Sequence, residues 1–231
     1  MIDSWLDLVH GACCVGCGLP GRALCRDCRG RLPCGSVRVR PTPCPEGLAA
    51  CFAAGEYDGL LGRMVVAHKE RAAFALASPL GLALAAAAGP ALDPTTPSVL
   101  VPVPSRAAVV RARGHDPMLR VSRVAARHLR RTGFVVDVAR LLEQHRPVAD
   151  QVGLGSEQRA ANLSGSMRVR STTRARLARG GIPVSVVLCD DVVTTGATAR
   201  EAQRTLEQAG LRVRAVVTVA ATRRRFGPAS A

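Results

Sequence analysis

The stretch Val186-Val-Leu-Cys-Asp-Asp-Val-Val-Thr-Thr-Gly-Ala-Thr198 decides how the chain folds. Its apolar, β-branched start, which includes Val186, Val187 and Leu188, predicts a buried strand. Two carboxylates, Asp190 and Asp191, follow, and then a small, hydroxyl-rich turn opens a helical pattern over residues 199–209. The order strand, acid pair, turn and helix predicts a ligand site at this place.

Each residue type in this stretch suits a sugar phosphate. The start of a helix offers free backbone N–H groups and partial positive charge to a phosphate. Gly196 tolerates a positive φ and lets the backbone approach a ligand, and threonine hydroxyls donate further hydrogen bonds. Asp190 and Asp191 can serve one ligand where the strand ends, by accepting from two neighbouring sugar hydroxyls. The alternative is an ordinary strand–turn–helix with surface aspartates and an N-cap threonine.

The pattern closely resembles the signature of the type I phosphoribosyltransferases, which bind 5-phosphoribosyl-1-diphosphate (PRPP). This resemblance implies that Asp190 and Asp191 hold the ribose hydroxyls and that the threonine–glycine loop holds the 5-phosphate. The PRPP-binding segment implied in this way comprises Asp190, Asp191, Val192, Val193, Thr194, Thr195, Gly196, Ala197 and Thr198.

Length and composition bound the class of protein. A chain of 231 residues can bury a full core, and we expect a cysteine-rich segment over residues 1–52 and a larger domain over residues 53–231. The net charge of +15 favours anionic ligands, although the arginines are spread over the whole chain. Only 3% of the residues are aromatic, so a base-stacking nucleic-acid platform is not expected.

Lys69 is the only lysine among 32 basic residues. A compact ammonium differs physically from the planar guanidinium of arginine, so this position invites a contact with a phosphate or a diphosphate. An isolated lysine on a solvated helix face explains the same observation, and composition does not separate the two.

The amino terminus shows no secretory signal, since Asp3 and Asp7 stand where a basic region is expected. Residues 72–92 carry no charge, but they are mostly alanine and are interrupted by Pro79 and Pro90, which favours a buried helix over a membrane span. We therefore expect a cytoplasmic protein without membrane insertion.

Eight of the nine cysteines lie within residues 13–51. The pairs Cys14-Val-Gly-Cys17 and Cys25-Arg-Asp-Cys28 match the two knuckles of a tetrahedral zinc site. Cys13 can replace Cys14 as a ligand, and a disulfide framework is the rival interpretation, although nothing indicates export.

The remaining cysteines are harder to interpret. Cys34, Cys44 and Cys51 resemble a second knuckle whose spacing is lost, with His10 as a conceivable fourth ligand. Cys189 is expected to act as a small core residue within its strand.

Strands and helices alternate along the rest of the chain. This order predicts an α/β fold with a doubly wound parallel sheet, as in the type I phosphoribosyltransferases. Ligands of such sheets lie beyond the carboxyl ends of the strands, where Ser105-Arg106 and the loop after Asp190 both fall. Strands are expected over residues 99–104, 134–138, 182–190 and 211–221, and helices from Tyr57-Asp-Gly onward and over residues 72–88, 118–131 and 199–209.

Residues 141–166 are polar and poor in core residues. A loop of this length is usually functional or disordered, so we expect either a lid that closes over a diphosphate or a floppy insertion. The lid residues would be Gln151, Arg159 and Asn162.

The order of features over nearly the whole chain resembles the ComF family, the competence protein ComF-like phosphoribosyltransferases. The motifs that carry this resemblance are the cysteine knuckles, Tyr57-Asp-Gly, His68-Lys69, Val101-Pro-Val-Pro104, Arg113-Gly-His-Asp116, the run Gln151, Arg159 and Asn162, and the segment from Asp190 to Thr198. The family usually has R-G-F-N-Q where this chain has Arg113-Gly-His-Asp-Pro117. Membership would imply a phosphoribosyltransferase-like domain, and a link to single-stranded DNA and DNA-processing proteins during natural transformation.

Two functions follow as expectations. In the first, PRPP binds with Mg²⁺ and its phosphoribosyl group passes to an unknown acceptor; Ser105 and Arg106 hold the diphosphate. The catalytic residues would be Asp190, Asp191, Lys69, Arg106 and Arg159. In the second, the chain senses PRPP or binds single-stranded DNA without transfer chemistry. The oligomeric state is left open.

Overall fold

A six-stranded sheet forms the centre of the computed structural model, which describes residues 13–105, 107–146, 163–179 and 184–222. The strand order is β1-β2-β8-β7-β3-β4, and only the pairing of β1 with β2 is antiparallel. The strands are β1 (Val37–Val39), β2 (Ala50–Glu56), β3 (Ser98–Pro102), β4 (Val136–Val138), β7 (Ser185–Val193) and β8 (Val213–Ala221). The protein therefore has the mostly parallel α/β fold that the alternation of elements predicts.

The central strands are buried on both faces. Along β7, Val186 and Leu188 face one core cluster, whereas Val187 and Cys189 face the other. All four side chains are at most 1% exposed, which explains why this strand is a continuous apolar run. The prediction that Cys189 serves as a core residue is confirmed.

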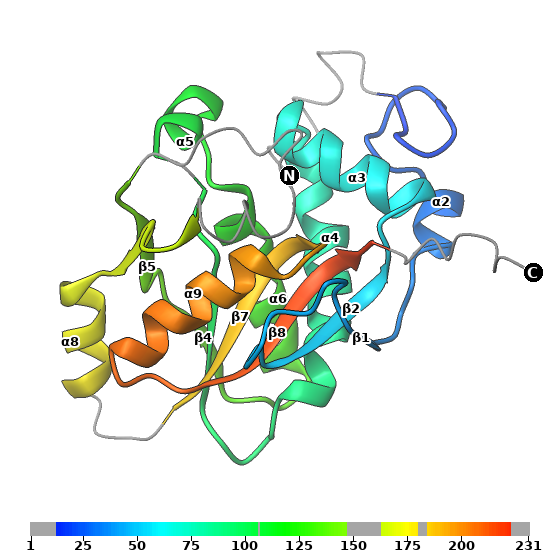
Figure 1. The fold of residues 1–231 in the computed structure, drawn as a ribbon. Coiled ribbons are helices and arrows are strands. Elements are labelled where there is room, and N and C mark those ends of the chain that lie inside the picture. The colour runs from blue at the N-terminus through cyan, green and yellow to red at the C-terminus, as the bar shows by residue number, and fades with distance from the viewer. Residues whose placement is uncertain (1–12, 106, 147–162, 180–183, 223–231) are drawn as a thin grey trace, which may run out of the picture.

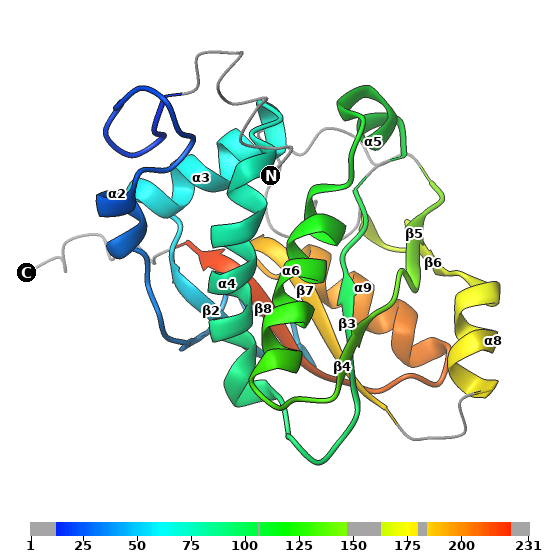
Figure 2. The same ribbon diagram turned by 180° about the vertical axis from the view of Figure 1, so that it is seen from behind.

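Helices cover both faces of this sheet. Helices α4 (Ala77–Ala88) and α6 (Pro117–Arg131) lie on one face, and α9 (Ala197–Gln208) lies on the other (Figures 1 and 2). The short turns η1 (Phe74–Leu76) and η2 (Gly89–Ala91) flank α4, while α3 (Gly59–Glu70) begins at the N-cap Asp58 as expected. Helix α2 (Arg26–Gly30) lies in the cysteine-rich segment, close to α3 (Figure 1).

The alanine-rich segment is part of the core. Residues Phe74–Ala91 are long and apolar enough to cross a membrane, but 61% of this window is buried inside the fold. Leu76, Leu80 and Leu84 are at most 2% exposed and belong to the cluster between α4, α6 and the sheet. The interpretation as a buried helix is confirmed, as such burial is typical of the core helix of a soluble protein.

The crossing of α4 and α6 depends on Gly81. A Cβ placed on this residue would lie 2.4 Å from Cβ of Val124 and 3.0 Å from the carbonyl oxygen of Val121. We expect Gly81→Ala to destabilise the protein by about 1–3 kcal/mol through overpacking, despite the better helix propensity of alanine. Thermal unfolding should show a midpoint lowered by about 2–4 °C per kcal/mol. Gly89→Ala is the control, because no atom lies within 4 Å of its Cβ position; an equal midpoint in both variants would contradict the packing argument.

A second, two-stranded antiparallel sheet lies beside the main one. It pairs β5 (Leu142–Gln144) with β6 (Met167–Val169), and α8 (Ser171–Arg179) follows β6. The expectation that residues 141–166 form a loop is thus wrong at its beginning, because Leu142 is buried against Leu141 and Met167 and anchors a strand. The predicted lid residues Gln151, Arg159 and Asn162 lie outside the described residues.

The amino-terminal cysteine segment packs on the main core. Cys14, Cys25 and Cys28 share a buried cluster with Leu61 and Met64 of α3. Strand β2 runs from Ala50 to Glu56, across the proposed boundary at residue 52. The division into residues 1–52 and 53–231 stays a prediction.

Candidate functional site

Strands β3 and β7 form the topological switch point of the sheet. From β3 the chain passes through α5 (Ala107–Arg113) and α6 to its outer neighbour β4. From β7 it passes through α9 to β8 on the opposite side. In open α/β sheets, ligands bind beyond the carboxyl ends of the two strands at which this direction reverses.

The end of β7 is open on one side. Its pairing with β3 ends at Cys189, opposite Pro102, where the N–H of Val103 donates the last hydrogen bond to the carbonyl oxygen of Cys189 at 2.8 Å. Pairing with β8 continues to Val193, so the strand extends three residues beyond the predicted end at Asp190. Asp190 and Asp191 therefore lie in a strand whose β3 side is free of a neighbouring strand.

A pocket of about 320 Å³ lies beside this open end of β7. Three of its walls come from Asp190 and Asp191 on β7, Ser105 after β3, and Thr198 on α9. Lys69 at the end of α3 lines it as well. The other lining residues are Val103, Pro104, Val109, Pro117, Met118, Gln144, Leu163, Met167 and Val192.

The two carboxylates are held in place by backbone amides. The N–H of Asp191 donates to Oδ1 of Asp190 at 2.9 Å, and the N–H of Val192 donates to Oδ1 of Asp191 at 2.8 Å. Burial raises the pKa of Asp190 well above its ordinary value, and the negative charge of Asp191 raises it further against the opposing effect of Lys69. An acid pair of this kind is typical of a ligand site.

Lys69 contacts the acid pair directly. Its Nζ lies 2.5 Å from Oδ2 of Asp191, and the two side chains are 39% and 20% exposed. Burial disfavours the charge of Lys69, but the charges and hydrogen bond of the aspartates outweigh it, so that the pKa of Lys69 is raised. Of the two interpretations left open by the sequence, the placement favours a residue of the site over an isolated surface lysine.

The turn after β7 packs against Leu48, a residue from another part of the chain. Residues 194–196 form a bend, and Gly196 has a φ of 72°, a left-handed conformation that favours glycine. A Cβ at Gly196 would lie 2.8 Å from Cδ2 of Leu48, so the missing side chain makes room for another part of the chain. Thr198, in the first turn of α9, lines the pocket.

The structure does not bring all predicted residues to the pocket. Val193 is 5% exposed and packs against Ala53 and Ala221, on the core side of the strand. Thr194 is exposed and Thr195 is half-buried. Neither they nor Gly196 and Ala197 line the pocket. Arg106 lies outside the described part of the chain.

The departure from the R-G-F-N-Q pattern has a structural role. The ring of His115 packs edge-on against Phe74, with centroids 4.6 Å apart, and against His68 at 5.6 Å. Asp116 caps α6 by accepting from the N–H of Leu119 at 3.1 Å. Pro117 and Met118, which follow, line the pocket, so this segment shapes the pocket wall.

The raised pKa of Asp190 predicts that Asp190→Asn stabilises the free protein at neutral pH. The pKa of the Asp190 carboxyl is raised above the ordinary aspartate pKa of 3.8. At higher pH, ionising this carboxyl therefore costs the native state free energy, and an asparagine side chain has no such cost. The protonated carboxyl contributes its full share of the free energy of unfolding below pH 3.8, and this share is lost as the pH rises towards the raised native pKa. We expect a gain of about 1 kcal/mol at pH 7.

Thermal unfolding from pH 4 to pH 8 measures this effect. The difference in midpoint between Asp190→Asn and the parent should grow with pH and shrink towards pH 4. Asp137→Asn is the control, since the Asp137 side chain is 87% exposed. A difference in midpoint that is independent of pH, or that has the opposite sign, would show that ionising Asp190 does not destabilise the native state.

The four predicted zinc ligands lie together. The Sγ atoms of Cys14, Cys17, Cys25 and Cys28 are all within 4.8 Å of one another, and three of these residues are buried. Cys13 is exposed and does not belong to the group, which resolves the alternative left open by the sequence. The donor set fits a tetrahedral zinc ion, for which four thiolates are a common structural site.

Hydrogen-bond donors surround these sulfur atoms. The backbone N–H of Cys25 donates to Sγ of Cys14 at 3.3 Å, and the N–H of Cys28 donates to Sγ of Cys25 at 3.4 Å. Nη2 of Arg31 lies 3.1 Å from Sγ of Cys28. A Cβ on Gly16 would lie 2.5 Å from that sulfur, so only glycine fits the first knuckle. Such donors compensate the charge of thiolates around a metal.

The other cysteines form no second site within the described ranges. Cys34 and Cys44 are exposed, whereas Cys51 is 3% exposed in β2. Burial raises the pKa of the Cys51 thiol to about 12. Among the described residues, the cluster of four cysteines is the only group of side chains arranged to bind a metal ion. His10 lies outside those residues.

Neither a protein-family model nor a curated protein matches the chain. The resemblance to the type I phosphoribosyltransferases and to the ComF family therefore rests on the sequence motifs.

Proposed function

We propose that the protein binds PRPP through Mg²⁺ and transfers its phosphoribosyl group to an acceptor. One observation carries the proposal. An acid pair, a helix N-terminus and a lysine surround one pocket at the switch point of a parallel sheet. This combination suits a ligand with vicinal hydroxyls and phosphates at both ends.

Each end of PRPP has a matching partner. Asp190 and Asp191 accept from the ribose hydroxyls, and the first turn of α9 with Thr198 receives the 5-phosphate. Ser105 and Lys69 both line the pocket, and we assign them to the diphosphate. The ion pair between Lys69 and Asp191 keeps both side chains oriented, and an incoming diphosphate competes for the ammonium.

The acid pair also fits Mg²⁺, which prefers carboxylate and phosphate oxygens. Asp190 and Asp191 would hold it together with oxygens of PRPP itself. When bound, the ion would neutralise charge on the diphosphate.

In the transfer, the bond from C1 to the diphosphate oxygen breaks and a bond from C1 to the acceptor forms. The acceptor supplies the electron pair of the new bond and releases its proton to water, and the diphosphate leaves with the electron pair of the broken bond. Lys69 stabilises the charge that grows on this leaving group. We assign the same role to Arg106 and Arg159, and the role of a water-excluding lid to the segment with Gln151 and Asn162.

The cysteine cluster is proposed to hold one structural Zn²⁺, with Cys14, Cys17, Cys25 and Cys28 as its ligands. A cluster of four cysteines that suits zinc favours a reducing compartment, and a cytoplasmic location is proposed on that ground. The link to DNA uptake and its partners follows from the ComF resemblance alone and is proposed only on that ground.

Release of pyrophosphate tests the transfer. The purified protein is incubated with PRPP, Mg²⁺ and a panel of purine, pyrimidine and pyridine bases, and pyrophosphate is measured with a coupled assay. We expect release that depends on one class of base and disappears in Asp190→Asn with Asp191→Asn. Tight PRPP binding without release of pyrophosphate under any of these conditions would contradict transfer and support the alternative that the protein senses PRPP.

A further inference from the structure

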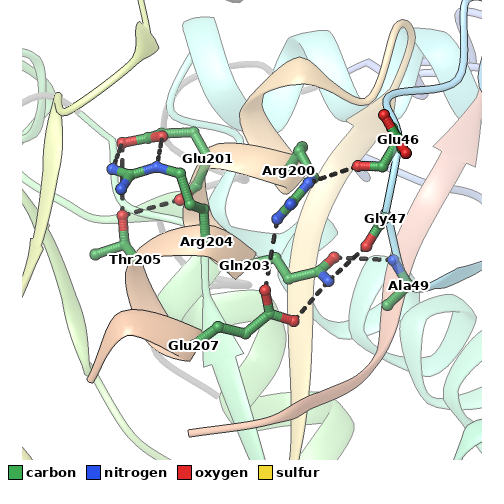
Figure 3. Close-up of polar contacts among 9 residues, drawn as sticks. All are labelled: Glu46, Gly47, Ala49, Arg200, Glu201, Gln203, Arg204, Thr205 and Glu207. Atoms are coloured by element: carbon green, nitrogen blue, oxygen red, sulfur yellow. Dashed lines mark hydrogen bonds and ion pairs between the residues drawn. The ribbon is translucent and has the colours of Figure 1, made fainter. Parts of the chain in front are cut away.

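Residues 41–49, here called the 41–49 loop, connect β1 to β2 and lie against the start of α9. They come from the amino-terminal end of the described chain, some 150 residues before the helix that they contact. Figure 3 shows Glu46, Gly47 and Ala49 of this loop facing side chains of α9.

Gln203 joins the two segments through its side-chain amide. Its Oε1 accepts from the N–H of Ala49 at 2.8 Å, and its Nε2 donates to the carbonyl oxygen of Gly47 at 2.8 Å (Figure 3). Nε2 also donates to Oε1 of Glu207 at 2.8 Å. Gln203 is 4% exposed, so its amide is a buried group whose donors and acceptor are all used.

Arg200 makes a second, parallel link. Its Nε donates to the carbonyl oxygen of Glu46 at 2.8 Å, and its Nη1 lies 3.5 Å from Oε2 of Glu207 (Figure 3). The guanidinium covers Gly47, since a Cβ there would lie 3.3 Å from Nη2. With a φ of 70°, Gly47 adopts the left-handed conformation that this contact needs.

The loop held in this way covers the turn before α9. The Cβ position of Gly196 lies 2.8 Å from Leu48, and 3.2 Å from both Pro41 and Pro45. Gly196 is the N-cap of α9, directly before the helix turn that faces the pocket. The 41–49 loop therefore packs against the turn of residues 194–196, which precedes α9.

We propose that Gln203 is a positioning residue for the 5-phosphate, acting through the 41–49 loop. This inference rests on the proposed function for the identity of the ligand, and on the contacts above for the mechanism. Gln203 holds Leu48 against Gly196, and Gly196 is the N-cap of the helix whose first turn brings Thr198 to the pocket. Gln203 itself does not line the pocket.

Removal of the amide predicts a local loss of order. In Gln203→Ala, the N–H of Ala49 and the carbonyl of Gly47 lose their partner, which costs free energy only while the loop stays docked. The loop should then detach more often, and the turn before α9 should open with it. The diphosphate end, around Ser105 and Lys69, is on other elements and should be unaffected.

Hydrogen exchange of the ligand-free protein tests the contact. In Gln203→Ala and in Leu48→Ala, we expect the amides of residues 48 and 200, which donate to the carbonyl oxygens of Pro45 and Gly196, to exchange at least about tenfold faster, while those of β3 do not change. Arg204→Ala is the matched control: Arg204 lies on the same helix and bonds Glu201 at 2.7 and 2.8 Å, away from the loop (Figure 3). Equal exchange in Gln203→Ala and Arg204→Ala would overturn the proposal.

Titration with two probes tests the consequence for the ligand. Ribose 5-phosphate reports on the turn, and pyrophosphate with Mg²⁺ reports on the other end. We expect Gln203→Ala to bind ribose 5-phosphate at least about tenfold more weakly and pyrophosphate equally well. Equal weakening of both probes indicates general destabilisation and overturns the positioning role.

The two claims fail separately. If the parent protein binds neither probe, the proposed function fails, whereas the exchange measurement still decides whether Gln203 holds the turn. If the parent binds both and Gln203→Ala changes neither exchange nor affinity, the positioning role alone is wrong.

Discussion

Replacing Asp190 and Asp191 together by asparagine is expected to lower the affinity for PRPP by about 100- to 10,000-fold. Each carboxylate accepts a hydrogen bond from a ribose hydroxyl, and a hydrogen bond to a charged group contributes about 1.5–3 kcal/mol. Asparagine keeps the volume of the side chain but loses the charge. Titration calorimetry with Mg²⁺ present measures the change directly.

The design separates a lost ligand contact from a lost fold. Thermal unfolding checks the fold of the double variant, because Asp191→Asn also removes the ion-pair partner of Lys69. Asp137→Asn makes the same chemical change on β4, where the side chain is 87% exposed, and should bind like the parent. An affinity of the double variant within about threefold of the parent, roughly 0.6 kcal/mol, would show that the acid pair is not the ribose site.

The second large effect is expected at the cysteine cluster. We predict that the purified protein contains one zinc per chain and that Cys25→Ser combined with Cys28→Ser abolishes it. Structural zinc contributes about 10–16 kcal/mol of apparent binding free energy in small domains, so the segment around α2 should lose its order. Elemental analysis measures the metal, and hydrogen exchange over residues 13–34 measures the order.

The chain provides a matched control for this change. Cys34→Ser combined with Cys44→Ser removes two thiols that are exposed and outside the cluster, and it should leave the zinc content unchanged. A native protein isolated without metal, with the segment ordered as in the structure, would contradict a zinc site.

Much of the fold follows from local patterns in the sequence. The run from Val186 to Cys189 is apolar on both faces, so it indicates a central strand of a parallel sheet without further information. Pro102 ends β3 as expected, and the helix that begins at Ala197 follows from its turn residues. Strand β2 was not predicted, because Ala50-Cys-Phe-Ala-Ala-Gly-Glu56 has no β-branched residue and no alternation of polarity.

The site was predictable only where its residues are close in sequence. Asp190, Asp191 and Thr198 share one motif, so their chemistry was visible at once. The contact between Lys69 and Asp191 joins positions 122 residues apart, and composition alone could not choose between a site residue and a surface lysine. Gln203 gave no signal at all, since its role depends on the docking of the 41–49 loop.

The extension of β7 shows why tertiary pairing was needed. The sequence places the strand end at the acid pair, because consecutive strand residues point to opposite faces. In the structure the strand continues to Val193 on the β8 side and is unpaired on the β3 side beyond Cys189. Because the end of β7 is paired on one side only, both carboxylates line the pocket. Local sequence does not indicate which of its two neighbouring strands remains paired with this end.

The most direct test of the account is a calorimetric titration of PRPP into the purified, unmodified protein, with and without Mg²⁺. We predict saturable binding of one PRPP per chain that requires Mg²⁺. No binding in either condition, by a protein that is folded and carries its metal, would contradict the central claim that the pocket between β3 and β7 is a PRPP site.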